Sequence, residues 1–184
     1  EILRCLVGSE MCIRDSGNMA HNTLTINNKR HLVNSYASIN RIYKSEDMKG
    51  AEVDLISVFA DDMEKVVRII YLNEEDDLIV KDELVTGEKE ALVTWIMVTP
   101  AEAKIIGKNQ MELAKDGHRM LLTVIAPGDV EMKLWSNEPL HAFDEPNPGS
   151  MRVGFETHLP ANRKNLLKVT LNPVSYTHLT LPTT

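Results

Sequence analysis

Histidines are the residues of this 184-residue chain with the clearest capacity for chemistry, because an imidazole can bind a metal or exchange a proton near neutral pH. Apart from His178 near the C-terminal end, they are scattered along the chain: His21, His31, His118, His141 and His158. No pair has the spacing that places two metal ligands on one helix face. Judged one at a time, each is expected to have a hydrogen-bonded structural role or a solvated one.

Two other features could take part in binding. The carboxylate run Glu74-Glu75-Asp76-Asp77 resembles a calcium-binding cluster in composition. It lacks the alternating ligand spacing and the glycine of a calcium loop, so a solvated turn between two strands is expected. Trp95 lies in a run that is apolar on both faces and should belong to the core. Trp135 stands at a strand end beside a long loop, where it could stack on a sugar ring, although capping the core edge is favoured.

Several functional classes lack their usual marks. The chain has no glycine-rich phosphate loop, no GxSxG turn and no HExxH pair. A formal net charge of −7 and the lack of a basic stripe argue against nucleic-acid binding. No stretch approaches the roughly 18 consecutive apolar residues of a membrane span. We therefore expect neither nucleic acid nor membrane as a partner.

The two ends differ in character from the rest of the chain. Residues 1–16 (EILRCLVGSEMCIRDS) and 174–184 (VSYTHLTLPTT) resemble translated sequencing-adapter read-through, and we interpret them as non-native scars. One domain is then expected over 17–173. Cys5 and Cys12 fall within the first scar, so this domain would have no disulfide, thiol nucleophile or cysteine-type zinc site. If the cysteines are native instead, a peptide map of the natural protein would recover them.

The region between the scars is built from short β-type runs separated by turn residues, which predicts an all-β, antiparallel, supersandwich-like β-sandwich. A polar segment with Tyr36 and Tyr43 interrupts the runs, and 136–150, with three prolines, should be an exposed loop. The expected strands are 22–27, 51–60, 64–72, 77–85, 90–99, 103–106, 110–114, 118–126, 129–136, 151–159 and 165–172.

Turn residues predict four hairpins, at Gly87, Gly107, Asp116-Gly117 and Pro127-Gly128. Alternation in 151–159 predicts one buried face and one wet face. The runs LVTWIMV (92–98) and MLLTVIA (120–126) are apolar on both faces. They are expected to be central strands, covered on both sides by another sheet or by a missing domain.

The segment MAHNTLTINNKRH (19–31) resembles the His-Asn-(Ser/Thr)-Leu strand of the heparinase II/III-like polysaccharide lyases. VVRIIYLNEEDDLIVKDEL (66–84) is similar to the family's arginine-containing strand, followed by a hairpin into a strand with a central aspartate. TWIMVTP (94–100) and the tail 135–173 add to the likeness, which covers 17–173. The resemblance implies a C-terminal β-sandwich region, truncated from a larger protein that also contains an N-terminal α/α toroid.

The resemblance also implies a chemistry, namely β-elimination on uronic-acid-containing glycans of the heparin or heparan sulfate type. A base removes the C5 proton and an acid protonates the leaving oxygen. The family's catalytic residues lie upstream, so none is expected in this chain, and the fragment alone should be inactive. The parent is expected in the periplasm or outside the cell.

His21 matches the histidine that, in several family members, completes a mainly structural zinc site with an upstream histidine and an upstream aspartate. Zinc needs about four ligands, so zinc is expected in the parent and not in the fragment. The alternative function is a non-catalytic carbohydrate-binding or structural β-sandwich module. The upstream reading frame would discriminate, because a toroid of helices favours the lyase and a different catalytic domain or a stop favours the module. A metal-dependent hydrolase is disfavoured because no second ligand accompanies His21.

Overall fold

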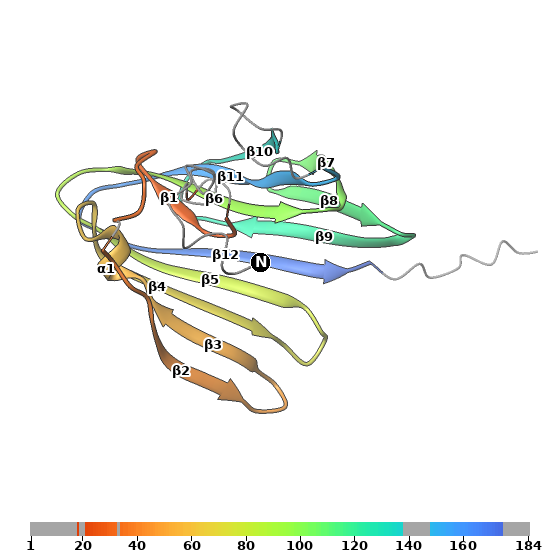
Figure 1. The fold of residues 1–184 in the computed structure, drawn as a ribbon, viewed down its shortest axis with the longest axis horizontal. Coiled ribbons are helices and arrows are strands. Elements are labelled where there is room, and N and C mark those ends of the chain that lie inside the picture. Colours follow the sequence, from red (N-terminus) through yellow and green to blue (C-terminus); the bar gives the residue numbers. More distant parts are fainter. Residues whose placement is uncertain (1–17, 19–20, 33, 138–147, 175–184) are drawn as a thin grey trace, which may run out of the picture.

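The computed structural model describes residues 18, 21–32, 34–137 and 148–174. Within these ranges the chain is almost entirely β-strand, with one short helix (Figure 1). The elements are β1 (Leu24–Ile26), β2 (Ser38–Lys44), β3 (Lys49–Asp54), α1 (Ile56–Phe59), β4 (Met63–Leu72), β5 (Leu78–Thr86), β6 (Ala91–Thr99), β7 (Glu102–Gly107), β8 (Gln110–Lys115), β9 (His118–Ile125), β10 (Val130–Ser136), β11 (Met151–Leu159) and β12 (Lys164–Pro173).

Some sequence predictions concern residues outside these ranges. They include both proposed scars apart from Val174, the two cysteines, His141 and most of the proline-rich segment 136–150. The division of the chain at 17 and 173 therefore stays a prediction. In the part that the structure describes, no helix is long and apolar enough to cross a membrane.

The strands form two antiparallel sheets, which confirms the predicted sandwich. A four-stranded sheet has the order β1-β6-β11-β10, and an eight-stranded sheet has the order β2-β3-β4-β5-β12-β9-β8-β7. Every predicted run contains a strand. Two details were wrong. Residues 56–59 form α1 and not the end of a strand, with the Asp54 carboxylate accepting a hydrogen bond from the Ile56 amide at 2.9 Å.

The second error is that β2 was missed within the polar segment. Its sequence, SINRIYK, is exposed at almost every position and therefore lacks the alternation that marks a half-buried strand. It forms because β3 offers a free edge, and the ladder continues through a register shift between Ile39 and Arg41.

Two of the four predicted hairpins are real. Asp116 and Gly117, with φ of 51° and 80°, turn β8 into β9, and Gly107 lies at the β7–β8 turn. Gly87 and Pro127-Gly128 instead connect strands of different sheets. Gly128 does not have a positive φ. A Cβ there would lie 2.7 Å from the His158 carbonyl oxygen, so glycine permits a close approach between chain segments.

The core lies between the two sheets. Trp95 of β6 is 3% exposed, which confirms its predicted place, and its ring stacks on Phe155 of β11 with centroids 5.9 Å apart. β11 alternates as predicted: Val153, Phe155 and Leu159 are buried, whereas His158 is exposed. β6 and β9 are interior strands, but coverage on both sides is wrong for β9, because Ile125 is 59% exposed.

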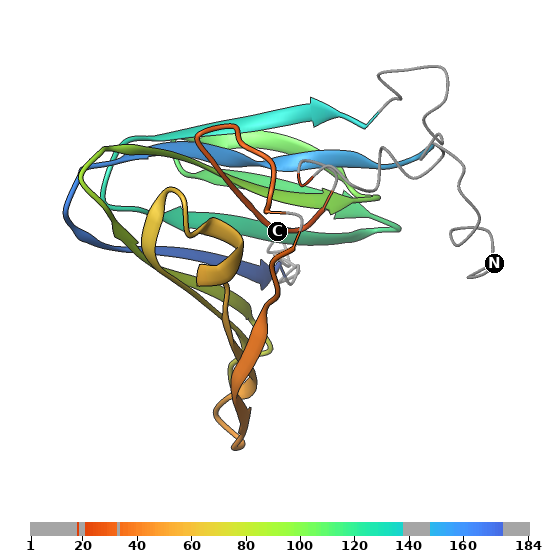
Figure 2. The same ribbon diagram turned by 60° about the vertical axis from the view of Figure 1, so that its left-hand side comes forward.

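The eight-stranded sheet is wider than its partner, so β2, β3 and the adjoining part of β4 project beyond the four-stranded sheet (Figures 1 and 2). The register places Ile39 beside Val53 and Val53 beside Arg68, so these residues share the side that faces inward elsewhere in the sandwich. We call the projecting inward side the overhang. Its large exposed apolar side chains are Ile39, Ile42, Ile70 and Leu72.

Candidate functional site

The short strand β1 carries the segment most similar to the lyases, and asparagines fix it to the four-stranded sheet. β1 pairs with β6, and Leu24 lies opposite Trp95. The Asn27 amide donates to the Leu92 carbonyl at 2.8 Å, and the Leu92 amide donates to Asn27 Oδ1 at 2.9 Å. At the other end, the Val98 amide donates to Asn22 Oδ1 at 2.7 Å. Side-chain amides at both ends therefore extend a ladder of only three residues.

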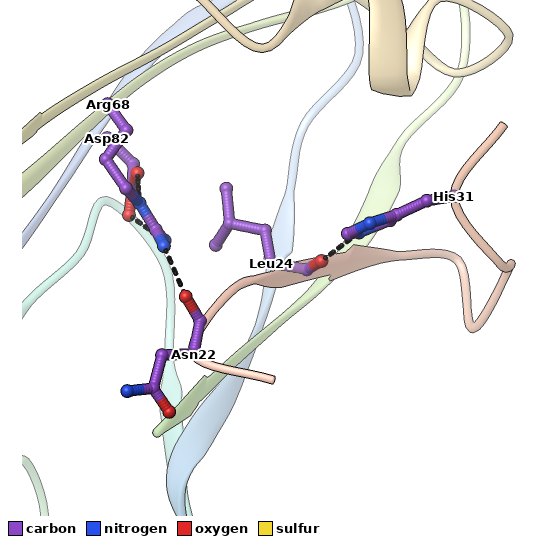
Figure 3. Close-up of polar contacts among 5 residues, drawn as sticks. All are labelled: Asn22, Leu24, His31, Arg68 and Asp82. Carbon is purple, nitrogen blue, oxygen red and sulfur yellow. Dashed lines mark hydrogen bonds and ion pairs between the residues drawn. The ribbon is translucent and has the colours of Figure 1, made fainter. Parts of the chain in front are cut away.

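A buried ion pair fixes the same segment to the eight-stranded sheet (Figure 3). Arg68 of β4 and Asp82 of β5 are cross-strand neighbours, and two parallel hydrogen bonds of 2.6 and 2.9 Å join guanidinium to carboxylate. Both side chains are almost fully buried. The third contact of the guanidinium, from Nη1, is a hydrogen bond to the Asn22 carbonyl oxygen at 3.3 Å. The pair thus links β4 and β5 to the first residues of β1.

His21 lies immediately before this anchored residue and is exposed. Its amide donates to the Asn18 carbonyl at 3.2 Å, and its own carbonyl accepts from the Thr23 amide at 2.9 Å. The backbone at His21 is therefore held from both sides.

The described residues do not fit a complete zinc site. Among them, no group of three or more histidine, cysteine, aspartate or glutamate side chains could hold a metal ion. Since zinc needs about four ligands, His21 would depend on ligands from elsewhere. Its assignment as a ligand stays a prediction.

His31, at the end of this segment, has the structural role predicted for it. His31 Nε2 donates to the Leu24 carbonyl at 2.9 Å (Figure 3). The His31 ring also meets the Phe59 ring edge-on at a centroid distance of 5.0 Å. His31 therefore fastens the loop after β1 back onto β1 and the core. His118 and His158 are exposed on β9 and β11, as expected for solvated residues. None of these histidines joins His21 in a metal-binding group.

The acidic run is the predicted turn, and Glu74, Glu75 and Asp76 are exposed as expected, but Asp77 is buried. It connects β4 to β5, and Asn73 organises it by accepting from the Glu75 and Asp77 amides at 3.0 and 2.8 Å. Asp76 has a φ of 59°, as in a tight turn. Trp135 is half-buried near the end of β10. Its role, either stacking on a sugar or capping the core, stays a prediction.

Sequence reasoning missed two hollows on the outward face of the eight-stranded sheet. One, of about 390 Å³, has four carboxylates in its lining: Glu52, Asp54, Glu64 and Glu83. The other, of about 370 Å³, is lined by Lys65, Glu83, Leu84, Val85, Lys164, Asn165 and Leu166. Alternation in 78–86 and 164–173 could have assigned Glu83 and Val85 to one face of their strand, and Lys164 and Leu166 to one face of theirs. It could not have shown that β5 and β12, far apart in sequence, are neighbours.

Comparison with known proteins bears on the fold. No family model and no curated protein matches the chain. Several solved structures do. A crystal structure of heparinase III has a TM-score of 0.69 at 15% identity and covers 91% of this chain. Another heparinase III has a TM-score of 0.66 at 16% identity. Heparan sulfate lyase HepC from Pedobacter heparinus has a TM-score of 0.65 at 15% identity.

The likeness is one of fold, because the identities are low. It extends over nearly the whole of this chain but only 26% of each heparinase III chain and 27% of the HepC chain. The chain thus has the fold of about a quarter of these proteins, as the resemblance of its sequence to the heparinase II/III-like family implied.

Proposed function

We propose that this chain is the C-terminal β domain of a polysaccharide lyase that cleaves heparin- or heparan-sulfate-like glycans by β-elimination. The observation that supports the proposal is the match of 91% of the chain to part of heparinase III. The residues of the sequence motifs that suggested the family have identifiable structural roles. The His-Asn-Thr-Leu segment leads into β1 and ends on its first residue, Leu24, and the arginine and aspartate of 66–84 form the buried pair Arg68–Asp82.

β-Elimination requires a base near C5 of the uronate, a group that neutralises its carboxylate and an acid at the leaving oxygen. In the described ranges, His21, His118 and His158 lie at separate places and do not converge with carboxylates. The chain therefore serves as a scaffold in this proposal, and the reacting groups come from the rest of the parent.

We place the rest of the parent protein on the overhang. Ile39 and Ile42 are 65% and 60% exposed, and Ile70 and Leu72 continue the same apolar strip toward the core. A contiguous apolar surface on a sheet face is typical of an interaction site. The rest of the parent, expected to be an α/α toroid, would cover the overhang, which the four-stranded sheet does not cover.

The test compares the full-length parent with this chain on heparan sulfate, following the ultraviolet absorbance of the unsaturated uronate product. We expect product from the parent and none from the chain alone. Product formation by the purified chain would contradict the scaffold role. A parent that yields no unsaturated product from any uronate-containing glycan would contradict the lyase assignment.

A further inference from the structure

Lysines gather on the outward face of the eight-stranded sheet, opposite to the side that packs in the core. The register places Lys65 of β4 and Lys164 of β12 on either side of Val85 of β5. Adjacent strands lie about 4.8 Å apart, so the two lysine stems are separated by roughly 10 Å. Four residues further along β12, Lys168 lies directly opposite Lys81. Four lysines from three adjacent strands therefore share one patch, which we call the lysine patch.

Among the described residues, only one of the four lysine charges of this patch is paired with a carboxylate. Lys65 pairs with Glu83 at 2.7 Å. In the part of the chain that the structure describes, Lys81, Lys164 and Lys168 have no carboxylate within ion-pair distance. Lys81 instead lies over the Tyr71 ring, 5.0 Å from its centroid.

Like charges that face each other across a ladder destabilise a sheet. The Lys81–Lys168 pair is such an arrangement, in a chain whose formal net charge is −7. Neighbouring acidic residues are plentiful in the sequence, yet none pairs with these two side chains among the described residues. An anion bound between them would offset the repulsion.

The patch also has a hollow and an apolar floor. The hollow of about 370 Å³ between Lys65 and Lys164 is lined in addition by Glu83, whose carboxylate pairs with Lys65, and by Val85 and Leu166, which is half exposed. This volume lies within the usual range for small-molecule sites. An apolar floor bordered by ammonium groups suits a sugar ring that carries sulfate or carboxylate groups.

We infer that the lysine patch binds a sulfated uronate oligosaccharide, at a site separate from the overhang and from His21. The choice of a saccharide as the anion rests on the proposed function. The patch would hold a remote part of the polymer, because no described residue in it has the arrangement of base and acid that elimination requires.

The test is an NMR titration of the ¹⁵N-labelled chain with a sulfated heparan-type tetrasaccharide at low salt. We expect amide shifts confined to β4, β5 and β12, and an affinity that falls as salt screens the lysines. Lys164→Gln with Lys168→Gln should weaken binding roughly ten-fold, at about three- to five-fold for each exposed charge contact. Lys104→Gln is the matched control, since Lys104 lies on the same sheet at its β7 edge.

Folding is separated from binding by thermal melts of the same variants. Removing Lys168 relieves its repulsion with Lys81. The double glutamine variant should therefore melt no lower than the unsubstituted chain, although it binds more weakly. Arginine at both positions should retain binding. Equal binding by the double glutamine variant and the control would overturn the inference.

Two further probes distinguish sources of the anion. Inorganic sulfate should bind at least ten-fold more weakly than the tetrasaccharide, and an unsulfated uronate oligosaccharide should fall between them. Equal affinity for free sulfate and tetrasaccharide would overturn a saccharide site. Lyase activity of the parent is measured separately, so a failure of this titration leaves the proposed function standing, and the reverse also holds.

Discussion

The contact between Arg68 and Asp82 determines more than the pairing of two strands. The guanidinium uses a third donor, on Nη1, for the Asn22 carbonyl, so one buried charge pair fixes the eight-stranded sheet to the entry of β1. Buried ion pairs gain little net free energy over an apolar pair of the same shape, because desolvation offsets their attraction. Their loss is costly when only one partner is removed.

Asp82→Ala should therefore lower the free energy of unfolding by about 3–5 kcal/mol, because Arg68 would remain buried without its carboxylate. Urea unfolding followed by circular dichroism measures this. Glu83→Ala is the control on the neighbouring residue. It breaks the Lys65 ion pair, whose side chains are about half exposed, and should cost at most about 1 kcal/mol. Equal costs for the two variants would contradict the role given to the buried pair.

Glycines give a second test at the same scale. A Cβ on Gly154 of β11 would lie 1.9 Å from the Trp95 carbonyl oxygen, in the middle of the four-stranded sheet. Gly154→Ala should force β11 away from β6 and cost about 2–3 kcal/mol or more. Gly87→Ala meets no atom within 4 Å and should change the free energy of unfolding by no more than about 0.5 kcal/mol. Thermal melts measure the stability of both variants. A Gly154→Ala variant as stable as the unsubstituted chain would contradict the prediction.

At the scale of elements, the strands that alternate or that are apolar on both faces could be predicted from the sequence. β11 and β12 show why, because their period of two coincides with one buried face. β2 could not be predicted, since an exposed edge strand requires no apolar period. The sheet to which each strand belongs was also hidden. Gly87 and Pro127-Gly128 have ordinary turn sequences, yet their chain crosses between sheets.

The candidate site, too, could be predicted from the sequence only in part. Arg68 and Asp82 could be named from a family motif, but their burial and their contact with Asn22 depend on the packing of one sheet over the other. The lysine patch could not be found from spacing, because β12 lies beside β5 only in the folded chain.

The overhang leads to a prediction for elements. Ile39→Thr with Ile42→Thr should change the stability of the isolated chain by no more than about 0.5 kcal/mol for each substitution, because both side chains are already exposed. The same double variant should reduce self-association, since it interrupts the exposed apolar strip beside an edge strand. Urea unfolding and sedimentation velocity measure the two effects.

The control for that pair is Leu24→Ala, in the core. Leu24 is fully buried, so this change should cost about 2–5 kcal/mol without altering the overhang. If the threonine variant loses as much stability as Leu24→Ala, the overhang is part of the core and not an open face.

At the scale of the whole molecule, the chain has the fold of about a quarter of each matched lyase, and under the proposed function it acts within a larger parent. The overhang leaves a surface for a second domain, and the backbone around His21 is fixed by hydrogen bonds to Asn18 and Thr23. A second domain docked on this one could therefore complete a metal site without rearranging β1.

Metal content then distinguishes the fragment from the parent. We expect the purified chain to retain no stoichiometric zinc, because the described residues provide no complete ligand set, and the full-length parent to carry about one zinc per chain. His21→Ala in the parent should release that zinc, as measured by elemental analysis after dialysis. His31→Ala is the matched control. It loses the hydrogen bond to Leu24 and the ring contact with Phe59, so it should lower stability but retain zinc. Full zinc in the His21→Ala parent would exclude His21 as a ligand, and zinc loss in both variants would trace the effect to β1 as a whole.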